Sequence, residues 1–310
     1  MVLLRGFTLV HRYIHIVLLS GLVLILLLWS RKGPQITEIK IAVVTILKDL
    51  RNINEYQLAM ETFECYCIYR RYAWVVINVS ENDTLKLLCP QEQFFFQRHC
   101  VTAQFLQENN YYDYVLFVDS DMGVINPKRR IEEYIMDDKD IIFYNRIWNF
   151  EVMAGSYLAK NYKDLFTYEA CVRAQLETNK KWKKKVSVLP KGQSWARDGW
   201  LTDSKWSEED FIFHGWQKRR LNKKAFASWK LPFLSTKFNM SLCGTNSYIE
   251  NWKYNQTFAR NPNEIRAELD TIITLNEFEY YKEKQNAGEI LANLTKNELV
   301  WHNFTNQHIQ

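Results

Sequence analysis

The sequence predicts an α/β domain, built on a mostly parallel, twisted sheet with flanking helices, behind an N-terminal transmembrane helix. Three observations predict it: an apolar run near the N-terminus, β-branched segments that alternate with helical patterns, and two carboxylates directly after the third such segment. The composition is that of a globular protein, with 47% hydrophobic and 15% aromatic residues and no repeat. One large domain is therefore expected after the N-terminal helix.

The N-terminal apolar run extends from Tyr13 to Trp29 and contains no Asp, Glu, Lys or Arg. Its length is near the lower limit for a helix that crosses a bilayer, and its few polar residues form no stripe. A cleaved signal peptide is the alternative, but the run is long for one and no small-residue cleavage site precedes Arg31. We expect a short cytoplasmic tail at 1–12, an anchor at 13–29, a stem at 30–40 and a folded domain at 41–310.

The orientation of the anchor depends on signals elsewhere in the chain, because the basic residues on its two sides are balanced. Asn-x-Ser/Thr sequons are more frequent than chance predicts, and all lie after the anchor, at Asn78, Asn82, Asn239, Asn255, Asn293 and Asn303. The 6 cysteines also come after the anchor, which favours one or two disulfides over free thiols, with the pairing left open. We expect a single-pass type II protein of the Golgi or endoplasmic reticulum membrane, with a glycosylated lumenal domain.

The first half of the domain alternates between two patterns. Short apolar, β-branched runs predict buried strands, and longer runs of mixed polarity predict helices between them. The order is strand (41–47), helix (55–71), strand (74–79), helix (91–107) and strand (114–118). Such alternation is typical of a parallel sheet covered on both faces, with binding sites at the carboxyl ends of its strands. Helical periodicity returns after residue 264, and Trp301, Phe304 and Ile309 are expected to pack on the core.

The triplet Asp119-Ser120-Asp121 lies at such a strand end. If the strand geometry continues, side chains alternate with a period of two, and the carboxylates of Asp119 and Asp121 point to the same side, where they can share a hard cation. A nucleoside diphosphate sugar needs such a cation, because Mn²⁺ or Mg²⁺ neutralises the diphosphate that leaves when the anomeric bond breaks. Alone, the triplet is more often a solvated turn or a helix cap. Its position after a buried strand favours a metal site.

Two other charged clusters are given the simpler interpretation. The acidic residues at 137–140 are predicted to form a solvated turn before a strand at 141–144, and the lysines at 180–185 a solvated basic loop. A net charge of +5 fits a phosphate-bearing ligand but is too small to indicate nucleic acid.

Between about Ile41 and Trp216 the sequence resembles a nematode-expanded family of unknown function, which is similar to the galactosyl- and mannosyltransferases of the fungal and plant Golgi. The resemblance is carried by Arg98-His99-Cys100, the residues 115–124 with Asn126-Pro127, the residues 154–158 with Lys160-Asn161, the residues 166–171, the residues 195–203 and His214-Gly215-Trp216. It implies a GT-A fold, type II topology, and Mn²⁺-dependent transfer of a hexose, with retention, from a nucleotide sugar to a glycan acceptor.

The resemblance also implies roles for single residues. Asp119 and Asp121 would hold the metal and the donor, and His214 would complete the metal site. An imidazole beside carboxylates suits Mn²⁺ better than Mg²⁺. A structural role is the alternative for His214, since a lone histidine is more often structural.

Further candidates are weaker. The small-residue turn Ala154-Gly155-Ser156 would let the donor approach the backbone closely, although a packing role for Gly155 is nearly as well supported. Glu151 is a candidate catalytic residue or a contact to the sugar or acceptor, and Thr45 is a candidate contact to the nucleotide.

One departure from the family concerns catalysis. Relatives carry several dozen residues between Asn161 and Tyr162 that this chain lacks, and in related transferases that segment supplies an acidic residue near the reacting sugar. The alternative to an active enzyme is therefore a catalytically impaired lumenal binding protein, or a truncated splice form or gene model. Asp198 belongs to a different family stretch and is not assigned as a substitute.

Overall fold

The computed structural model describes residues 20–21, 39–153, 173 and 185–307, and the chain divides into the units Met1–Ile39 and Lys40–Gln310. In the first unit only Ser20 and Gly21 are described as helical. Within the described ranges no helix is long and apolar enough to cross a membrane. Apart from these two residues, the predicted anchor at 13–29 lies outside the described residues.

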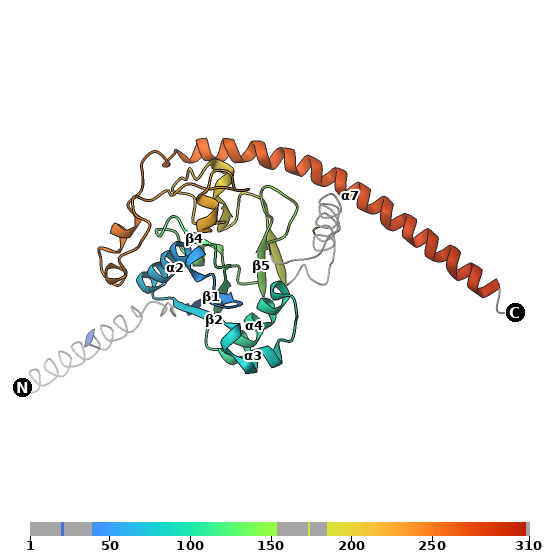
Figure 1. Ribbon diagram of the computed structural model, residues 1–310, viewed down its shortest axis with the longest axis horizontal. Coiled ribbons are helices and arrows are strands. Elements are labelled where there is room, and N and C mark those ends of the chain that lie inside the picture. The colour runs from blue at the N-terminus through green and yellow to red at the C-terminus, as the bar shows by residue number, and fades with distance from the viewer. Residues whose placement is uncertain (1–19, 22–38, 154–172, 174–184, 308–310) are drawn as a thin grey trace, which may run out of the picture. The chain divides into compact units, whose positions relative to one another are not determined.

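The second unit is a mixed α/β domain whose main sheet has the strand order β2-β1-β3 (Figure 1). β1 (Ile41–Leu47) pairs in parallel with both β2 (Ala73–Asn78) and β3 (Tyr114–Phe117). β1 is buried along its whole length, as expected for a central parallel strand made of β-branched residues. The three predicted strands are confirmed, with ends that differ by one residue at most.

Helices cover both faces of this sheet (Figure 1). α2 (Gln57–Arg70) packs on the face that Val43 points to, whereas α3 (Asp83–Leu88) and α4 (Phe94–Glu108) pack on the face that Val44 points to. Neighbouring residues of β1 thus enter different cores because side chains alternate along a strand. α2 and α4 confirm the predicted helices, and α3 was not predicted.

Two smaller sheets complete the strand pairings in the described part of the domain. One has the order β4-β8-β7, from β4 (Gly123–Val124), β8 (Ile212–His214) and β7 (Ala196–Asp198), with β4 antiparallel to β8. In the other, β5 (Ile141–Tyr144) pairs in parallel with β6 (Val186–Leu189). The pairings are mostly parallel, as predicted, but the strands belong to three sheets because the chain turns sharply after β3 and enters a different sheet as β4.

Short 3₁₀ helices connect these elements. They are η1 (Ile53–Glu55), η2 (Val79–Glu81), η3 (Ile131–Tyr134), η4 (Gly199–Thr202), η5 (Lys218–Leu221), η6 (Met240–Leu242) and η7 (Tyr248–Trp252).

The predicted C-terminal helix is α7 (Pro262–Gln307). Ile265 and Leu269 are buried there in a cluster with Ile147, which anchors the first turns of α7 to the domain. The prediction that Trp301, Phe304 and Ile309 pack on the core concerns side chains outside the described set.

Two disulfides confirm the prediction of one or two such bonds. Cys65 in α2 is bonded to Cys243, and Cys89 to Cys100 in α4. The first bond joins residues 178 positions apart, so it constrains the unfolded chain over most of the domain. Cys67 is a buried thiol, and Cys171 lies outside the described residues.

Candidate metal centre

Two carboxylates and one imidazole meet beyond the carboxyl end of β3. One ligand atom each from Asp119, Asp121 and His214 lies within 4.8 Å of the others. Oδ1 of Asp121 is 3.4 Å from Nε2 of His214. The sequence predicted these three residues as one site, and the structure brings them together.

The acidic residues converge through a turn and not through a continued strand. β3 ends at Phe117, and the backbone carbonyl of Asp119 accepts a hydrogen bond from the Met122 amide at 3.0 Å. The carbonyl of Asp121 then accepts bonds from the amides of Gly215 and Trp216, at 3.1 and 2.8 Å. The period-of-two argument for the acidic residues is therefore wrong in its geometry. The bonds from Gly215 and Trp216 are what place His214 beside the turn.

Two glycines permit this close approach. A Cβ on Gly123 would lie 2.3 Å from the Trp216 ring, so only glycine lets that ring pack against the strand after the acidic turn. Gly215 has a φ of 95°, in the region that favours glycine, and this conformation directs the chain away directly after His214.

Each carboxylate is held by a donor on one of its oxygens. Nη1 of Arg98, from α4, donates to Oδ1 of Asp119 at 2.6 Å. Nε2 of Gln217 donates to Oδ2 of Asp121 at 2.7 Å. Of the remaining oxygens, Oδ2 of Asp119 meets no donor in the described part of the chain, and Oδ1 of Asp121 faces Nε2 of His214, so both can bind a cation once the imidazole has lost that proton.

The imidazole is oriented by a buried carboxylate. Nδ1 of His214 lies 2.8 Å from Oδ1 of Asp198, and Asp198 also accepts from Nε and Nη2 of Arg146, at 2.9 and 2.6 Å. Nη2 of Arg146 is 3.1 Å from the same Nδ1, but Nδ1 cannot donate to Asp198 and accept from Arg146 at once. The carboxylate is the stronger partner, so Nδ1 carries the proton and Nε2 is directed toward Asp121. A carboxylate that binds the far nitrogen of a histidine is the usual support of a metal ligand.

The charges of the cluster are strongly coupled. Burial alone would lower the pKa of His214, but the carboxylates of Asp121 and Asp198 more than offset it and raise this pKa to about 10. Burial also opposes the charged form of Asp121, yet His214 and Gln217 hold its pKa well below the usual range. Burial raises the pKa of Asp119, which Arg98 offsets only in part. Without a cation, the site thus stabilises a positive charge on the imidazole, and a divalent ion would replace that proton.

The other predicted site residues do not join this cluster. Glu151 is connected to the cluster only through Arg146, because Oε2 of Glu151 accepts a hydrogen bond from Nη1 of Arg146 at 2.9 Å. Thr45 is fully buried in β1, and its hydroxyl has no hydrogen-bond partner in the described part of the chain. Ala154, Gly155 and Ser156 lie outside the described residues. Residues 137–140 form an exposed turn, as predicted.

Sequence reasoning missed the residues that hold the ligands in place. Arg98 and Asp198 lie in stretches that resemble the family, but only tertiary contacts show that each supports a ligand. No motif or strand-end position in the sequence pointed to Gln217 or Arg146.

Arg220 was also missed. It lies after the site in η5, and its charge helps to lower the pKa of Asp121. Its guanidinium makes no hydrogen bond or ion pair with the described residues, and a Cβ on Gly215 would lie 3.2 Å from its Nη1.

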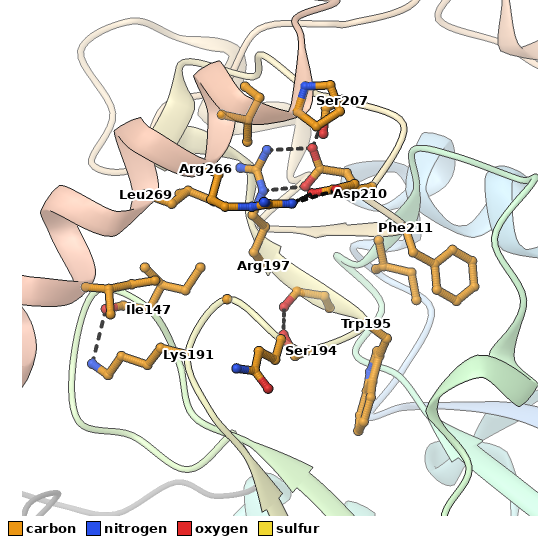
Figure 2. A pocket seen from close by; sticks show the side chains of 18 of the residues that line it. Ile147, Lys191, Ser194, Trp195, Arg197, Ser207, Asp210, Phe211, Arg266 and Leu269 are labelled. Carbon is orange, nitrogen blue, oxygen red and sulfur yellow. Dashed lines mark hydrogen bonds and ion pairs between the residues drawn. The ribbon is translucent and has the colours of Figure 1, made fainter.

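A separate cavity of about 410 Å³ lies between the first turns of α7 and the segment that includes β7 (Figure 2). Four of its charged side chains form two ion pairs: Arg197 with Asp210 at 2.5 Å, and Arg266 with Glu209 at 2.7 Å. No residue of the Asp119, Asp121 and His214 cluster lines it. The cavity and the candidate metal centre are therefore different places in the domain.

The fold and the site define an α/β protein with a candidate cation centre at the end of a parallel strand. The chain belongs to the family described as "Protein of unknown function, DUF273", which matches residues 63–163 and 159–230. Membership in a family of unknown function is thus confirmed.

Among solved structures, the chain is similar to "crystal structure of a glycosyltransferase involved in the glycosylation of the major capsid of PBCV-1". The identity is 14% over 56% of this chain and 93% of that chain, with a TM-score of 0.32. No curated protein matches the sequence.

Proposed function

We propose that this protein is a metal-dependent glycosyltransferase, which moves a hexose from a nucleotide sugar to a glycan acceptor with retention at the anomeric carbon. The observation that carries the proposal is the convergence of Asp119, Asp121 and His214, each held by its own buried partner, at the carboxyl end of a parallel strand. Strand ends of this kind are where α/β sheets bind nucleotides.

The three side chains fit a Mn²⁺ ion. Two carboxylate oxygens and one imidazole nitrogen form a mixed ligand set, which Mn²⁺ accepts more readily than Mg²⁺. An ion about 2.2 Å from each atom requires the atoms to lie within roughly 4.5 Å of one another, close to the spacing of 4.8 Å or less found here. When bound, the ion would neutralise the diphosphate that leaves the sugar.

Arg220 supplies the second charge that such a donor needs. Its guanidinium lies near Asp121 and is not engaged by the described residues, so it can donate hydrogen bonds to a phosphate. Lys218 and Arg219 precede it in the same short helix, which makes this edge of the site basic. Asp121, through the cation, and Arg220, directly, would thus both hold the diphosphate.

The alternative is a protein that binds the nucleotide with Mn²⁺ but transfers sugar poorly. The family match supports it, because the two matched segments meet at residues 159–163, where the missing family segment would lie. Binding requires the metal ligands, whereas turnover also requires groups that stabilise the charge developing at the anomeric carbon. Loss of one such group costs on the order of 10²–10³ in rate.

Calorimetric titration with uridine or guanosine diphosphate, with and without Mn²⁺, tests the shared part of both proposals. Donor turnover is measured on the same preparation. Mn²⁺-dependent binding with turnover supports the enzyme, with Glu151 the first candidate for the supporting charge. Binding without turnover supports the impaired protein, and no binding of either nucleotide overturns both.

We further propose that the domain faces the lumen of the Golgi or endoplasmic reticulum behind a type II anchor. Two disulfides and the sequons support this. Asn82 and Asn239 are exposed, whereas Nδ2 of Asn78, the atom that a glycan would modify, is buried. An N-glycosidase should lower the apparent mass of the microsomal protein. No shift, together with digestion of the domain by protease outside sealed microsomes, would show the opposite orientation.

A further inference from the structure

Three aromatic side chains from three separate segments meet next to the candidate metal centre. The ring centroids of Trp148 and Trp200 are 5.7 Å apart, and that of Phe226 is 6.0 Å from each. Trp148 lies after β5, Trp200 in η4 and Phe226 after η5. We call these three residues the aromatic cluster.

The cluster is joined to the metal centre through one arginine. The guanidinium of Arg146 lies over the Trp148 ring, 5.6 Å from its centroid, and the same group binds Asp198 and Glu151. Trp200 lies two residues after Asp198 in the chain. A ligand seated on these rings would therefore lie one side chain away from the residues that orient His214.

The aromatic cluster is partly open to solvent, although aromatic side chains that pack together are usually buried. Phe226 is 70% exposed, and both tryptophans are half-buried. Phe226 thus leaves the cluster accessible to a ligand, and sites for small molecules are lined mainly by aromatic and apolar side chains with a few polar groups. Glu151 is joined to the cluster through Arg146, and among the described residues only its Oε2 is engaged, which leaves Oε1 able to accept a hydrogen bond from a hydroxyl.

The chemistry of this surface matches a sugar ring. A hexose has one face of C–H groups that packs on an aromatic ring and an equatorial edge of hydroxyls that bonds to carboxylates. Arg146 is neutralised by Asp198 and Glu151, so the cation that lies over the Trp148 ring does not select a charged ligand. A second copy of the chain is the less suitable occupant, since it would block the adjacent metal centre.

We propose that Trp148, Trp200 and Phe226 form the platform that binds the acceptor glycan, with Glu151 bonding to its hydroxyls. The proposal rests on the glycosyltransferase function and adds to it the place and the class of the acceptor, a neutral glycan. Only the sugar unit that receives the hexose needs to contact the aromatic cluster. The donor would be held at Asp119, Asp121 and His214.

The test is direct binding of neutral disaccharides to the full chain in detergent, monitored by intrinsic tryptophan fluorescence. Lactose, α-1,2-mannobiose and cellobiose are the probes. At least one should bind and change the emission of Trp148 and Trp200. Phe226→Ala should weaken that binding about 10-fold, because it removes one exposed ring and little of the fold. Phe278→Ala is the matched control, since Phe278 is 69% exposed and lies on α7.

The outcomes separate this proposal from the function on which it rests. Mn²⁺-dependent nucleotide binding, measured on the same variants, should not change with Phe226→Ala. If nucleotide binding fails in the unmodified protein while a disaccharide binds at Phe226, the platform stands and the transferase function does not. Failure of every probe to bind, or equal loss in the Phe226 and Phe278 variants, overturns the platform. Loss of a dimer on light scattering, with sugar binding unchanged, also overturns it and assigns the cluster to self-association.

Discussion

The candidate metal centre and the cavity under α7 both contain several charged side chains, but the charges are balanced differently. In the cavity two arginines each have their own carboxylate, in the pairs Arg197–Asp210 and Arg266–Glu209. In the metal centre, Asp119 pairs with Arg98 and Asp198 with Arg146, whereas Asp121 faces the imidazole of His214, whose pKa is raised by the carboxylates of Asp121 and Asp198. Charges that cancel in pairs need no ligand. A cluster with more carboxylates than cations can be neutralised by a bound metal ion. Variants of the metal centre and of the cavity can both test this difference.

The largest effect is expected from Asp121→Asn. The change removes a charged metal ligand and should lower Mn²⁺-dependent nucleotide affinity by more than about 100-fold, below detection by calorimetry. Asp138→Asn, in the exposed turn at 137–140, is the control and should leave affinity unchanged. Equal losses from both changes would remove the reason to treat the residues after β3 as special.

The cavity should respond in stability and not in binding. Asp210→Asn leaves Arg197 without its carboxylate in a place where the two side chains are 7% and 9% exposed, and should cost about 3–5 kcal/mol of unfolding free energy. Glu209→Gln breaks the neighbouring pair, which is exposed to solvent, and should leave the unfolding free energy nearly unchanged. Thermal melts measure both. A drop in nucleotide affinity per folded molecule, without a lower melting temperature, would contradict this division of roles.

Asp198 should behave as a positioning residue of the metal centre. Asp198→Asn keeps an oxygen near Nδ1 of His214 but removes the charge that fixes the imidazole, and a loss of this kind typically weakens metal binding about 10–100-fold. Manganese titration monitored by electron paramagnetic resonance measures the affinity. Glu151→Gln breaks the other carboxylate contact of Arg146 and serves as control. An equal effect of the two variants would mean that Asp198 acts only by holding Arg146.

Metal affinity is also expected to depend on pH, with a gradual change that no substitution is needed to see. Below the raised pKa of about 10, His214 carries a proton that a metal ion must displace. Apparent Mn²⁺ affinity should therefore rise with pH, by up to about 10-fold per unit between pH 6 and 8. Calorimetry in buffers of different ionisation enthalpy counts the released protons. A flat profile with no proton release would show that His214 is not a ligand.

Local patterns determined much of the fold before any contact was known. The apolar run of β1 and the strand–helix alternation up to β3 result from side-chain periodicity, and periodicity depends only on neighbours in sequence. The position of Asp119 and Asp121 at a strand end, and the even number of cysteines, could be found in the same way. His214 was found through a resemblance and not through a pattern.

The tertiary structure decided what lies beside those residues. Arg98, Gln217 and Asp198 hold the ligands from α4, from the segment after β8 and from β7, and no spacing in the sequence connects them. The pairing of Cys65 with Cys243 and the meeting of three aromatic rings at Trp148 are of the same kind. Side-chain periodicity is a property of one segment, whereas a contact between distant segments depends on how the sheets and turns pack. The three metal ligands could therefore be predicted from the sequence, but the residues that orient them could be identified only in the tertiary structure.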